Sequence, residues 1–188
     1  MSRDHSSIEG IEAHRLVGAR QCPSPNCNER PPGQAPELVV IHCISLPPGR
    51  FGSGDVARLF TNCLDPQAHP DYPELCELRV SAHLLVDRQG RCTQFVPFDL
   101  RAWHAGVSSW RGRSGCNDYS IGIELEGVDD IPYEDAQYRT LARVIRTLRA
   151  AYPTLDRDAL AGHSEIAPGR KTDPGPAFDW GRLRELLA

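Results

Sequence analysis

The apolar segment 37–44 constrains the fold of this chain more than any other part of the sequence. It is rich in β-branched residues and does not alternate between polar and apolar positions, which is typical of a strand buried on both faces. The turn-forming sequence Pro47-Pro48-Gly49 follows, so the strand must end there. The segment therefore predicts an interior strand of a sheet that is covered on both sides.

The other periodic segments complete an α/β pattern. Within 120–125, Ile121 and Ile123 alternate with polar positions, which places the Glu124 carboxylate on the opposite face of a second strand. The remaining predicted elements are a short helix 55–60 capped by Asp55, a hairpin of strands 80–86 and 91–96, a helix 134–151 and a closing helix 177–187. This order predicts one α/β domain with a central mixed β-sheet flanked by helices.

The length of 188 residues suits a single domain. We expect a mobile N-terminus over residues 1–15 and the folded domain over residues 16–188, because the polar start of the chain is rich in turn formers. A long loop carrying Asp65-Pro66 and His69-Pro70 follows the short helix. Loops of such length between core elements are commonly functional.

The charge balance argues against two classes of partner. A net charge of -4 is unsuited to binding a phosphate backbone, so we expect no nucleic-acid partner. We expect the arginines of helix 134–151 to form a solvent-exposed face. The longest apolar run before residue 100 covers only residues 38–41, and the N-terminus lacks the apolar core of an export signal. We therefore expect no membrane partner.

The seven cysteines include no Cys-x-x-Cys pair. An odd number of cysteines without an export signal indicates free thiols in a reducing compartment, which predicts a cytoplasmic protein. Cys22 and Cys27 have a spacing that zinc sites can use, but no second pair follows, and small loop thiols are the alternative. A monomer is the default expectation.

Two of the histidines stand where catalytic groups are commonly held. His42 falls near the end of the first predicted strand, where the chain turns into a loop. His163 precedes the segment 169–176, which has too many turn formers for a helix or strand yet carries Lys171 and Asp173. One explanation is a zinc site of two histidines and one carboxylate with an open fourth position, the arrangement of catalytic zinc.

Five ordered blocks of sequence carry a more specific signal. They are 42–49 (HCISLPPG), 79–83 (RVSAH), 103–106 (WHAG), 117–127 (NDYSIGIELEG), and 162–163 (GH) with 171–176 (KTDPGP). Together they resemble the zinc N-acetylmuramoyl-L-alanine amidases, above all the cytoplasmic branch that acts on 1,6-anhydromuropeptides in cell-wall recycling. The resemblance extends over nearly the whole chain, and the five blocks in this order are far more specific than any one of them.

The resemblance implies one zinc ion per chain, bound by His42, His163 and Asp173, with Glu124 as general acid and base and Lys171 as a stabiliser of the oxyanion. The residue types agree with these roles. Zinc lowers the pKa of a water molecule to about 7, and attack on the amide carbonyl builds an alkoxide that a lysine cation can stabilise. Glu124 is placed to pass the water's proton to the leaving amine.

Two positions leave alternatives open. Glu126 lies two residues beyond Glu124 on the same strand face and is its main rival. Cys43 stands where the family usually has asparagine, and a thiol is a weak replacement for the hydrogen bonds of an amide. Its side chain should point away from His42, which argues against a metal ligand or a nucleophile. A cysteine hydrolase using Cys43 with His42 or His83 is the alternative, and its activity would survive chelation.

Further residues are candidates for substrate contact. They are Arg79, Trp103, His104, Arg113, Arg170 and Cys43. The arginines could pair with substrate carboxylates, with surface salt bridges as the alternative, and the Trp-His pair could form a platform for the sugar or lactyl group. His83 lies in a predicted strand and is expected to support the site from behind or to be structural.

The expected function is zinc-dependent hydrolysis of the amide between (1,6-anhydro-)N-acetylmuramic acid and L-Ala, with a small cytosolic muropeptide as the partner. An amidase of intact cell wall would share these residues but should carry an export signal or a wall-binding module. A non-catalytic peptidoglycan recognition module would typically have lost a zinc ligand.

Overall fold

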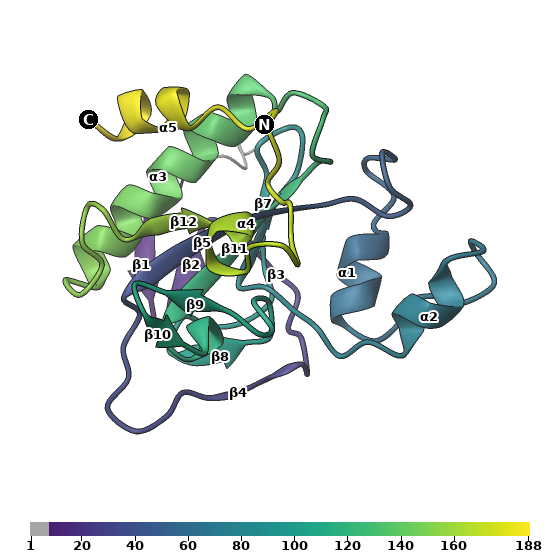
Figure 1. Ribbon diagram of the computed structural model, residues 1–188, viewed down its shortest axis with the longest axis horizontal. Helices are drawn as coiled ribbons and strands as arrows, with labels where there is room; N and C mark the ends of the chain where they lie inside the picture. Colours follow the sequence, from purple (N-terminus) through teal and green to yellow (C-terminus); the bar gives the residue numbers. More distant parts are fainter. Residues whose placement is uncertain (1–7) are drawn as a thin grey trace.

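The computed structural model describes residues 8–188 (Figure 1). Its strands are β1 (Gly10–Glu12), β2 (Arg15–Val17), β3 (Arg20–Gln21), β4 (Cys27–Glu29), β5 (Leu38–Ile44), β6 (Leu84–Val86), β7 (Cys92–Gln94), β8 (Leu100–Ala102), β9 (Ser109–Trp110), β10 (Arg113–Ser114), β11 (Ser120–Glu126) and β12 (Leu160–Gly162). Its helices are α1 (Asp55–Phe60), α2 (Tyr72–Cys76), the 3-10 turn η1 (Cys116–Asp118), α3 (Asp135–Ala151), α4 (His163–Ile166) and α5 (Trp180–Leu187). The expected mobile N-terminus lies partly outside the described residues, and from Gly10 the chain forms the antiparallel β1–β2 hairpin.

The central sheet has six strands in the order β12-β5-β11-β6-β7-β3. The strands β12, β5, β11 and β6 run parallel, whereas β7 is antiparallel to β6, so the sheet is mixed as predicted. The predicted interior strand is confirmed as β5, which is hydrogen-bonded to β12 on one edge and to β11 on the other. In the register of β5 and β11, His42 lies beside Glu124.

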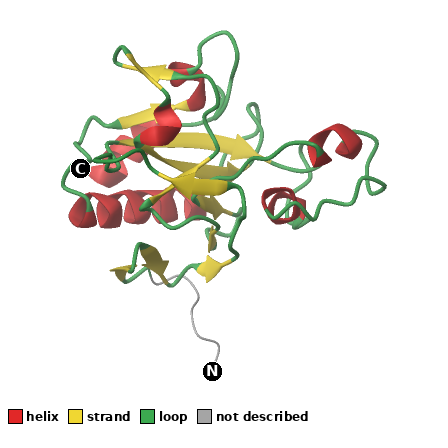
Figure 2. Cartoon of the chain, turned by 90° about the horizontal axis from the view of Figure 1, so that it is seen from below, coloured by secondary structure: helices red, strands yellow, loops and turns green. Residues whose placement is uncertain are grey.

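Alternation along β5 and β11 separates an apolar face of the sheet from a polar one. Ile41 of β5 and Ile123 of β11 belong to the main core cluster, together with Leu141 of α3. Figure 2 shows α3 as the long helix that runs along this face of the sheet. Because successive side chains of a strand point to opposite faces, His42 and Glu124 point to the other face.

The helix predicted over 134–151 is confirmed as α3. Its first turn is closed by a capping box, in which the N–H of Glu134 donates to Oε1 of Gln137 at 3.0 Å. The buried Gln137 side chain also donates to the carbonyl of Glu126 at 3.0 Å, which attaches the start of α3 to the end of β11. The predicted solvated arginine face is confirmed at Arg139 and Arg146, which are exposed.

The predicted hairpin and closing helix are also present, but each is shorter than expected. The hairpin strands are β6 and β7, and α5 begins only at Trp180. The carboxylate of Asp179 accepts the N–H of Arg182 at 2.9 Å and so caps the first turn of α5. This cap explains why the helix starts three residues after the predicted position.

The segment between β5 and β6 forms two short helices at the side of the sheet (Figures 1 and 2). The predicted helix 55–60 is confirmed as α1, but Asp55 is its first helical residue and not its cap. The Asp55 carboxylate instead accepts the Tyr72 hydroxyl at 2.8 Å and the Arg58 guanidinium at 2.5 Å, which joins α2 to α1. The sequence does not predict α2, because five residues are too few to show a helical period.

The loop between α4 and α5 passes very close to the backbone that follows β11. Gly175 has φ of 79°, and a Cβ atom there would lie 2.3 Å from Cα of Asp129. We expect Gly175→Ala to lower the free energy of unfolding by more than the roughly 1–2 kcal/mol of left-handed backbone strain alone, as measured by urea unfolding. Gly169→Ala is the matched control, since φ is 76° there and a Cβ would meet nothing within 4 Å. Equal losses in the two variants would contradict this packing argument.

Candidate metal centre

Three potential metal ligands meet at the carboxyl ends of two neighbouring parallel strands. His42 lies near the end of β5, and His163 is the first residue of α4, directly after β12. Asp173 reaches both from the loop after α4. The Nδ1 atoms of His42 and His163 are 3.0 Å apart, and each lies 3.1 Å from Oδ2 of Asp173. Within residues 8–188, no other group of three His, Cys, Asp or Glu side chains is placed to hold a metal ion.

The protonation states of His42 and Asp173 suit a metal site. His42 and His163 are 1% and 4% exposed, respectively. Burial lowers the pKa of His42 to about 4, so its imidazole is neutral at pH 7. Burial raises the pKa of Asp173, but the contacts with His163 and His42 outweigh it and hold this pKa well below its ordinary value. Neutral imidazoles and a carboxylate are the forms that zinc binds.

Glu124 is the carboxylate nearest to this group along the sheet. It lies on β11 beside His42, is 8% exposed, and its Oε2 atom is buried without a hydrogen-bond partner. Burial, followed by repulsion from Asp173, raises the pKa of Glu124 well above its ordinary value, although Lys171 acts in the opposite direction. A carboxyl group with a raised pKa can exchange a proton closer to neutral pH, as general acid–base catalysis requires.

Glu126, the rival of Glu124, has a different environment. Its Oε1 atom accepts the backbone N–H of Gly52 at 2.5 Å, and its Oε2 atom accepts that of Arg88 at 3.3 Å. Both oxygens therefore hold neighbouring loops in place. This difference favours Glu124 as the group that moves a proton.

Lys171 lies on the same loop as Asp173. Its side chain is exposed, and its positive charge lowers the pKa of both Glu124 and His42, after the larger effects of burial and of other neighbours. The structure thus brings the predicted lysine close enough to act electrostatically on the centre. A cation in this position can stabilise negative charge that develops on a bound molecule.

Two of the substrate-contact candidates lie against the two histidines. Nδ1 of His104 is 2.9 Å from Nε2 of His42. Arg170 donates to the carbonyl oxygen of Ala105 at 2.6 Å and lies 3.4 Å from Nε2 of His163. Both side chains therefore lie next to the potential metal ligands, and both already make hydrogen bonds to protein atoms there.

Three other candidates are held elsewhere. Arg113 pairs with Glu37 at 2.8 Å. Glu37 directly precedes β5, and the length of strand between it and His42 is roughly 16 Å. Trp103 donates from Nε1 to Oδ1 of Asn28 at 2.7 Å. The exposed Arg79 donates to backbone carbonyls at the end of α2. Their contacts to substrate stay predictions.

The sequence predicts His83 within a strand, but it directly precedes β6 and lies next to His104. It is fully buried, and its Nδ1 atom accepts the N–H of Gly122 on β11 at 3.0 Å. Burial, and then the charge of Arg30, lowers the pKa of His83 to about 3, so the ring is neutral. Its ring centroid is 5.9 Å from that of His104, so it supports the residue that contacts His42.

Cys43 faces away from His42, as the alternation along the strand predicts. It packs against the main core cluster, and its thiol lies 3.5 Å from Oδ1 of Asp129. Burial is the main factor that raises the pKa of Cys43 above its ordinary value, so the thiol stays protonated at pH 7. A half-buried, neutral thiol on the far face is a poor nucleophile and a poor metal ligand.

Sequence reasoning does not find every residue that adjoins the centre. The Asn117 side chain accepts the backbone N–H groups of His104 and Ala105, and Oγ of Ser120 lies 3.1 Å from Nε2 of His104. Both Asn117 and Ser120 belong to the conspicuous block 117–127. Nothing in the sequence, however, shows that this block lies against residues 104–105.

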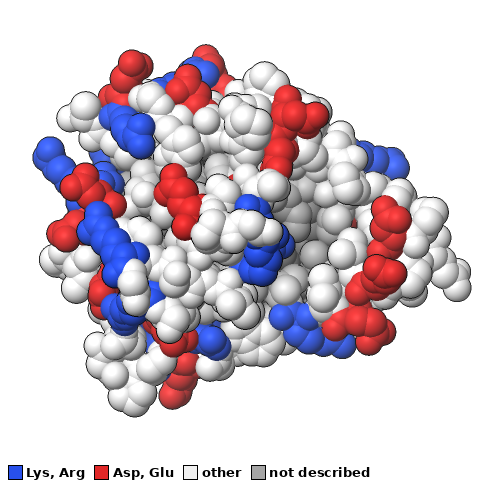
Figure 3. Space-filling model, in the orientation of Figure 1, with Lys and Arg blue, Asp and Glu red and all other residues white. Residues whose placement is uncertain are grey.

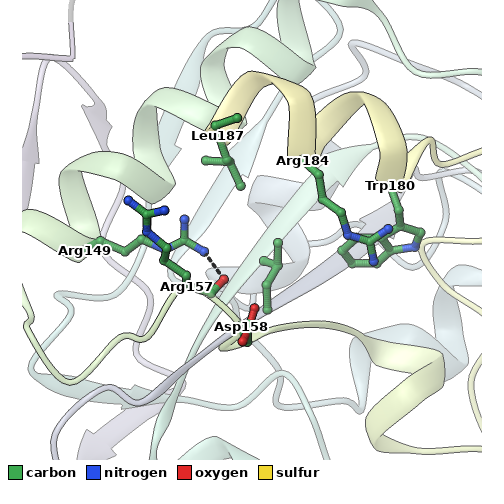
Figure 4. A pocket seen from close by; sticks show the side chains of 8 residues that line it. Arg149, Arg157, Asp158, Trp180, Arg184 and Leu187 are labelled. Carbon is green, nitrogen blue, oxygen red and sulfur yellow. Dashed lines mark hydrogen bonds between the residues drawn. The ribbon is translucent and has the colours of Figure 1, made fainter.

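A cavity beside α5 is separate from the metal centre (Figure 4). It has a volume of about 290 Å³ and is lined by Arg149, Arg157, Asp158, Leu160, Trp180, Arg184, Leu187 and Ala188. In Figure 4, Arg149 lies next to Arg157 and donates to its carbonyl oxygen at 2.6 Å. The cavity contains no histidine or cysteine, and it does not compete with the centre as a catalytic site.

The surface shows no bias towards one charge on the face seen in Figure 3. Acidic and basic side chains are interspersed over this face, in keeping with the net charge of -4. Among the described helices, none has the length and apolar character needed to cross a bilayer.

A mixed sheet that presents two histidines, an aspartate and a neighbouring glutamate at its strand ends is suited to a metal-dependent hydrolase. The family model of the N-acetylmuramoyl-L-alanine amidases matches residues 32–176, and the chain belongs to this family. The resemblance predicted from the five sequence blocks is thereby confirmed.

Several individual proteins are similar to this chain. The chain is 58% identical over 173 residues to the 1,6-anhydro-N-acetylmuramyl-L-alanine amidase AmpD of Salmonella typhimurium, with 92% of each protein covered. A crystal structure of a selenomethionine AmpD derivative matches with a TM-score of 0.92 at 53% identity, covering 95% of this chain and 99% of that one. AmpDh3 from Pseudomonas aeruginosa, solved in complex with an anhydromuramic pentapeptide, matches with a TM-score of 0.64 at 29% identity, covering 85% of this chain and 62% of that one.

Proposed function

We propose that this protein is a zinc-dependent amidase that cleaves the bond between 1,6-anhydro-N-acetylmuramic acid and L-Ala in small cytosolic muropeptides, as a step in peptidoglycan recycling. The observation that carries the proposal is the convergence of His42, His163 and Asp173 beside Glu124. The similarity to AmpD supports the anhydro substrate, and the pentapeptide complex of AmpDh3 supports a muropeptide ligand. A cytoplasmic location and a monomeric state stay expectations.

The side chains of the centre fit one zinc ion. The two imidazole nitrogens and the carboxylate oxygen converge, and both histidines have a hydrogen-bonding partner at their second ring nitrogen. Three protein ligands would leave one position open, as in catalytic zinc sites. When bound there, zinc would polarise the substrate carbonyl and lower the pKa of a water molecule.

The remaining chemistry falls to two side chains of the chain itself. Glu124 takes the proton that the attacking water loses and delivers it to the nitrogen of L-Ala, which then leaves as a neutral amine. The Oε2 atom of Glu124, which makes no hydrogen bond, is available for this transfer. The Lys171 cation stabilises the alkoxide that forms when the carbonyl carbon becomes tetrahedral.

The proposal is tested by release of stem peptide. Zinc-loaded protein is incubated with an anhydromuropeptide or with insoluble sacculi, and the products are separated and identified by mass spectrometry. We expect free stem peptide from the anhydromuropeptide and little from sacculi. Release from sacculi alone would favour an amidase of intact wall, and tight binding without release would favour a recognition module.

Cys43 is expected to be dispensable for catalysis. Because its half-buried thiol faces away from His42, Cys43→Ala should change kcat by less than about threefold, which corresponds to under about 0.7 kcal/mol. The measurement compares initial rates before and after removal of metal with a chelator. A loss of several orders of magnitude in Cys43→Ala, with wild-type activity that survives chelation, would instead establish the cysteine hydrolase alternative.

A further inference from the structure

The second ring nitrogens of the two histidine ligands meet consecutive residues of one loop. Nε2 of His42 is 2.9 Å from Nδ1 of His104, and Nε2 of His163 is 3.1 Å from the carbonyl oxygen of Ala105. Residues 104 and 105 form the centre of the Trp-His-Ala-Gly block. One short segment of chain therefore contacts both imidazoles on the side away from Asp173.

The contact of His163 fixes its tautomer, and metal binding through Nδ1 of His42 requires one arrangement of protons in His42 and His104. The carbonyl of Ala105 can only accept a hydrogen bond, so Nε2 of His163 carries the proton and Nδ1 has the free lone pair. For His42 to present its Nδ1 lone pair, its Nε2–H must donate to Nδ1 of His104. His104 then carries its own proton on Nε2 and donates to Oγ of Ser120 at 3.1 Å.

The loop is fixed by residues of the block 117–127. Oδ1 of Asn117 accepts the backbone N–H of His104 at 3.1 Å and that of Ala105 at 2.8 Å. Gly122 of β11 leaves the space for the imidazole, since a Cβ atom there would lie 2.4 Å from Cγ of His104. The position of His104 is therefore set on two sides, by an amide that holds its backbone and by a glycine that admits its ring.

We infer that His104 and Asn117 are positioning residues of the metal centre, which hold His42 and His163 in the tautomer and orientation that bind zinc through Nδ1. The inference rests on the proposed function, because it requires a metal at His42, His163 and Asp173. In this role His104 orients the metal-binding residue His42, whereas the sequence suggests that His104 forms part of a platform for the substrate. Partners of this kind on ligating histidines typically change metal affinity by 10–100-fold.

The first test measures zinc affinity in the purified full-length protein by competition with a chromophoric chelator. His104→Phe keeps a ring but removes the acceptor for His42, and we expect it to bind Zn²⁺ about 10–100-fold more weakly. His104→Gln retains an acceptor oxygen and a donor amide and should recover part of the loss. Asn117→Ala should weaken binding, whereas Asn117→Asp keeps the acceptor oxygen and should weaken it less.

The second test reads the tautomers directly and does not depend on any variant folding. Long-range ¹H–¹⁵N correlation spectra of the zinc-loaded wild-type protein should show His42, His163 and His104 all protonated on Nε2. A proton on Nδ1 of His104, or unchanged zinc affinity in a folded His104→Phe variant, would overturn the positioning role. A wild-type protein that binds no zinc would refute the proposed function itself, so the two failures are distinguishable.

Discussion

Replacing Glu124 by Gln is expected to lower kcat by about 10²–10⁴-fold while zinc content stays close to that of the wild type. Gln preserves the size of the side chain but cannot carry a proton from water to the leaving amine. Because this role is exerted in the transition state, KM should change much less than kcat. Steady-state release of stem peptide, with metal content measured by elemental analysis, checks both parts of the prediction.

Glu126→Gln is the matched control for this variant. Glu126 lies on the same face of β11, but its oxygens accept the backbone N–H groups of Gly52 and Arg88. We therefore expect Glu126→Gln to affect the stability of the adjoining loops more than kcat. Equal losses of kcat in the two variants would show that Glu124 has no special part in proton transfer.

The same Glu124→Gln variant should be at least as stable as the metal-free wild type at pH 7. The folded-state pKa of Glu124 is raised, so the folded protein binds this proton more tightly than the unfolded chain. The free energy of unfolding of the wild type therefore falls as pH rises above the unfolded-state pKa of about 4.3, and this decrease ends above the folded-state pKa. Thermal unfolding between pH 4 and pH 8 should show an advantage of the variant that grows with pH. An advantage that does not change with pH would contradict this explanation.

Replacing His163 by Ala is expected to abolish stoichiometric zinc binding and to reduce hydrolysis to the level of the chelated wild type. Removal of a ligand leaves two protein donors for the ion, and the loss of affinity should exceed the roughly 100-fold upper range for partners that only orient a ligand. Without the ion, water keeps a pKa near 15.7 and the carbonyl is not polarised, so little attack occurs at pH 7.

Metal content after gel filtration and the rate of stem-peptide release are measured on the same His163→Ala preparation. His69→Ala is the control, because His69 lies on the loop before α2 and its ring packs against Tyr72. We expect one zinc per chain in the wild type and in His69→Ala. Retention of zinc and activity in His163→Ala would remove His163 from the set of ligands.

The sequence predicts the main elements of the fold because their periods are long enough to recognise. The segment 37–44 has the unbroken apolar character that an interior parallel strand requires, and β5 is such a strand. The segment 134–151 repeats apolar residues over more than four helical turns, and the bounds of α3 agree with this prediction to within one residue. The short helix α2 escapes prediction, and Asp55 contacts Tyr72 instead of capping its helix, because both depend on packing between distant residues.

The ligand set at the candidate centre was predicted from the resemblance, and the structure explains why it is compact. His42 and His163 are 121 residues apart in sequence, yet they become neighbours because β12 pairs with β5 and places the start of α4 beside the end of β5. The choice between Glu124 and Glu126 was open from periodicity, since both point to the same face of the strand. Their hydrogen bonds, which depend on loops from elsewhere in the chain, distinguish them.

The amino-acid sequence by itself determined the α/β class, the interior strand that carries His42, the order of the five blocks and hence the family. These properties are encoded locally, in side-chain periods of two and 3.6 and in motifs of a few residues. Only the tertiary structure decided that His104 contacts His42, that Asn117 holds the loop in between, and that Arg113 pairs with Glu37 instead of facing the centre. Contacts of this kind depend on which segments the sheet brings together, and no local pattern in the chain encodes them.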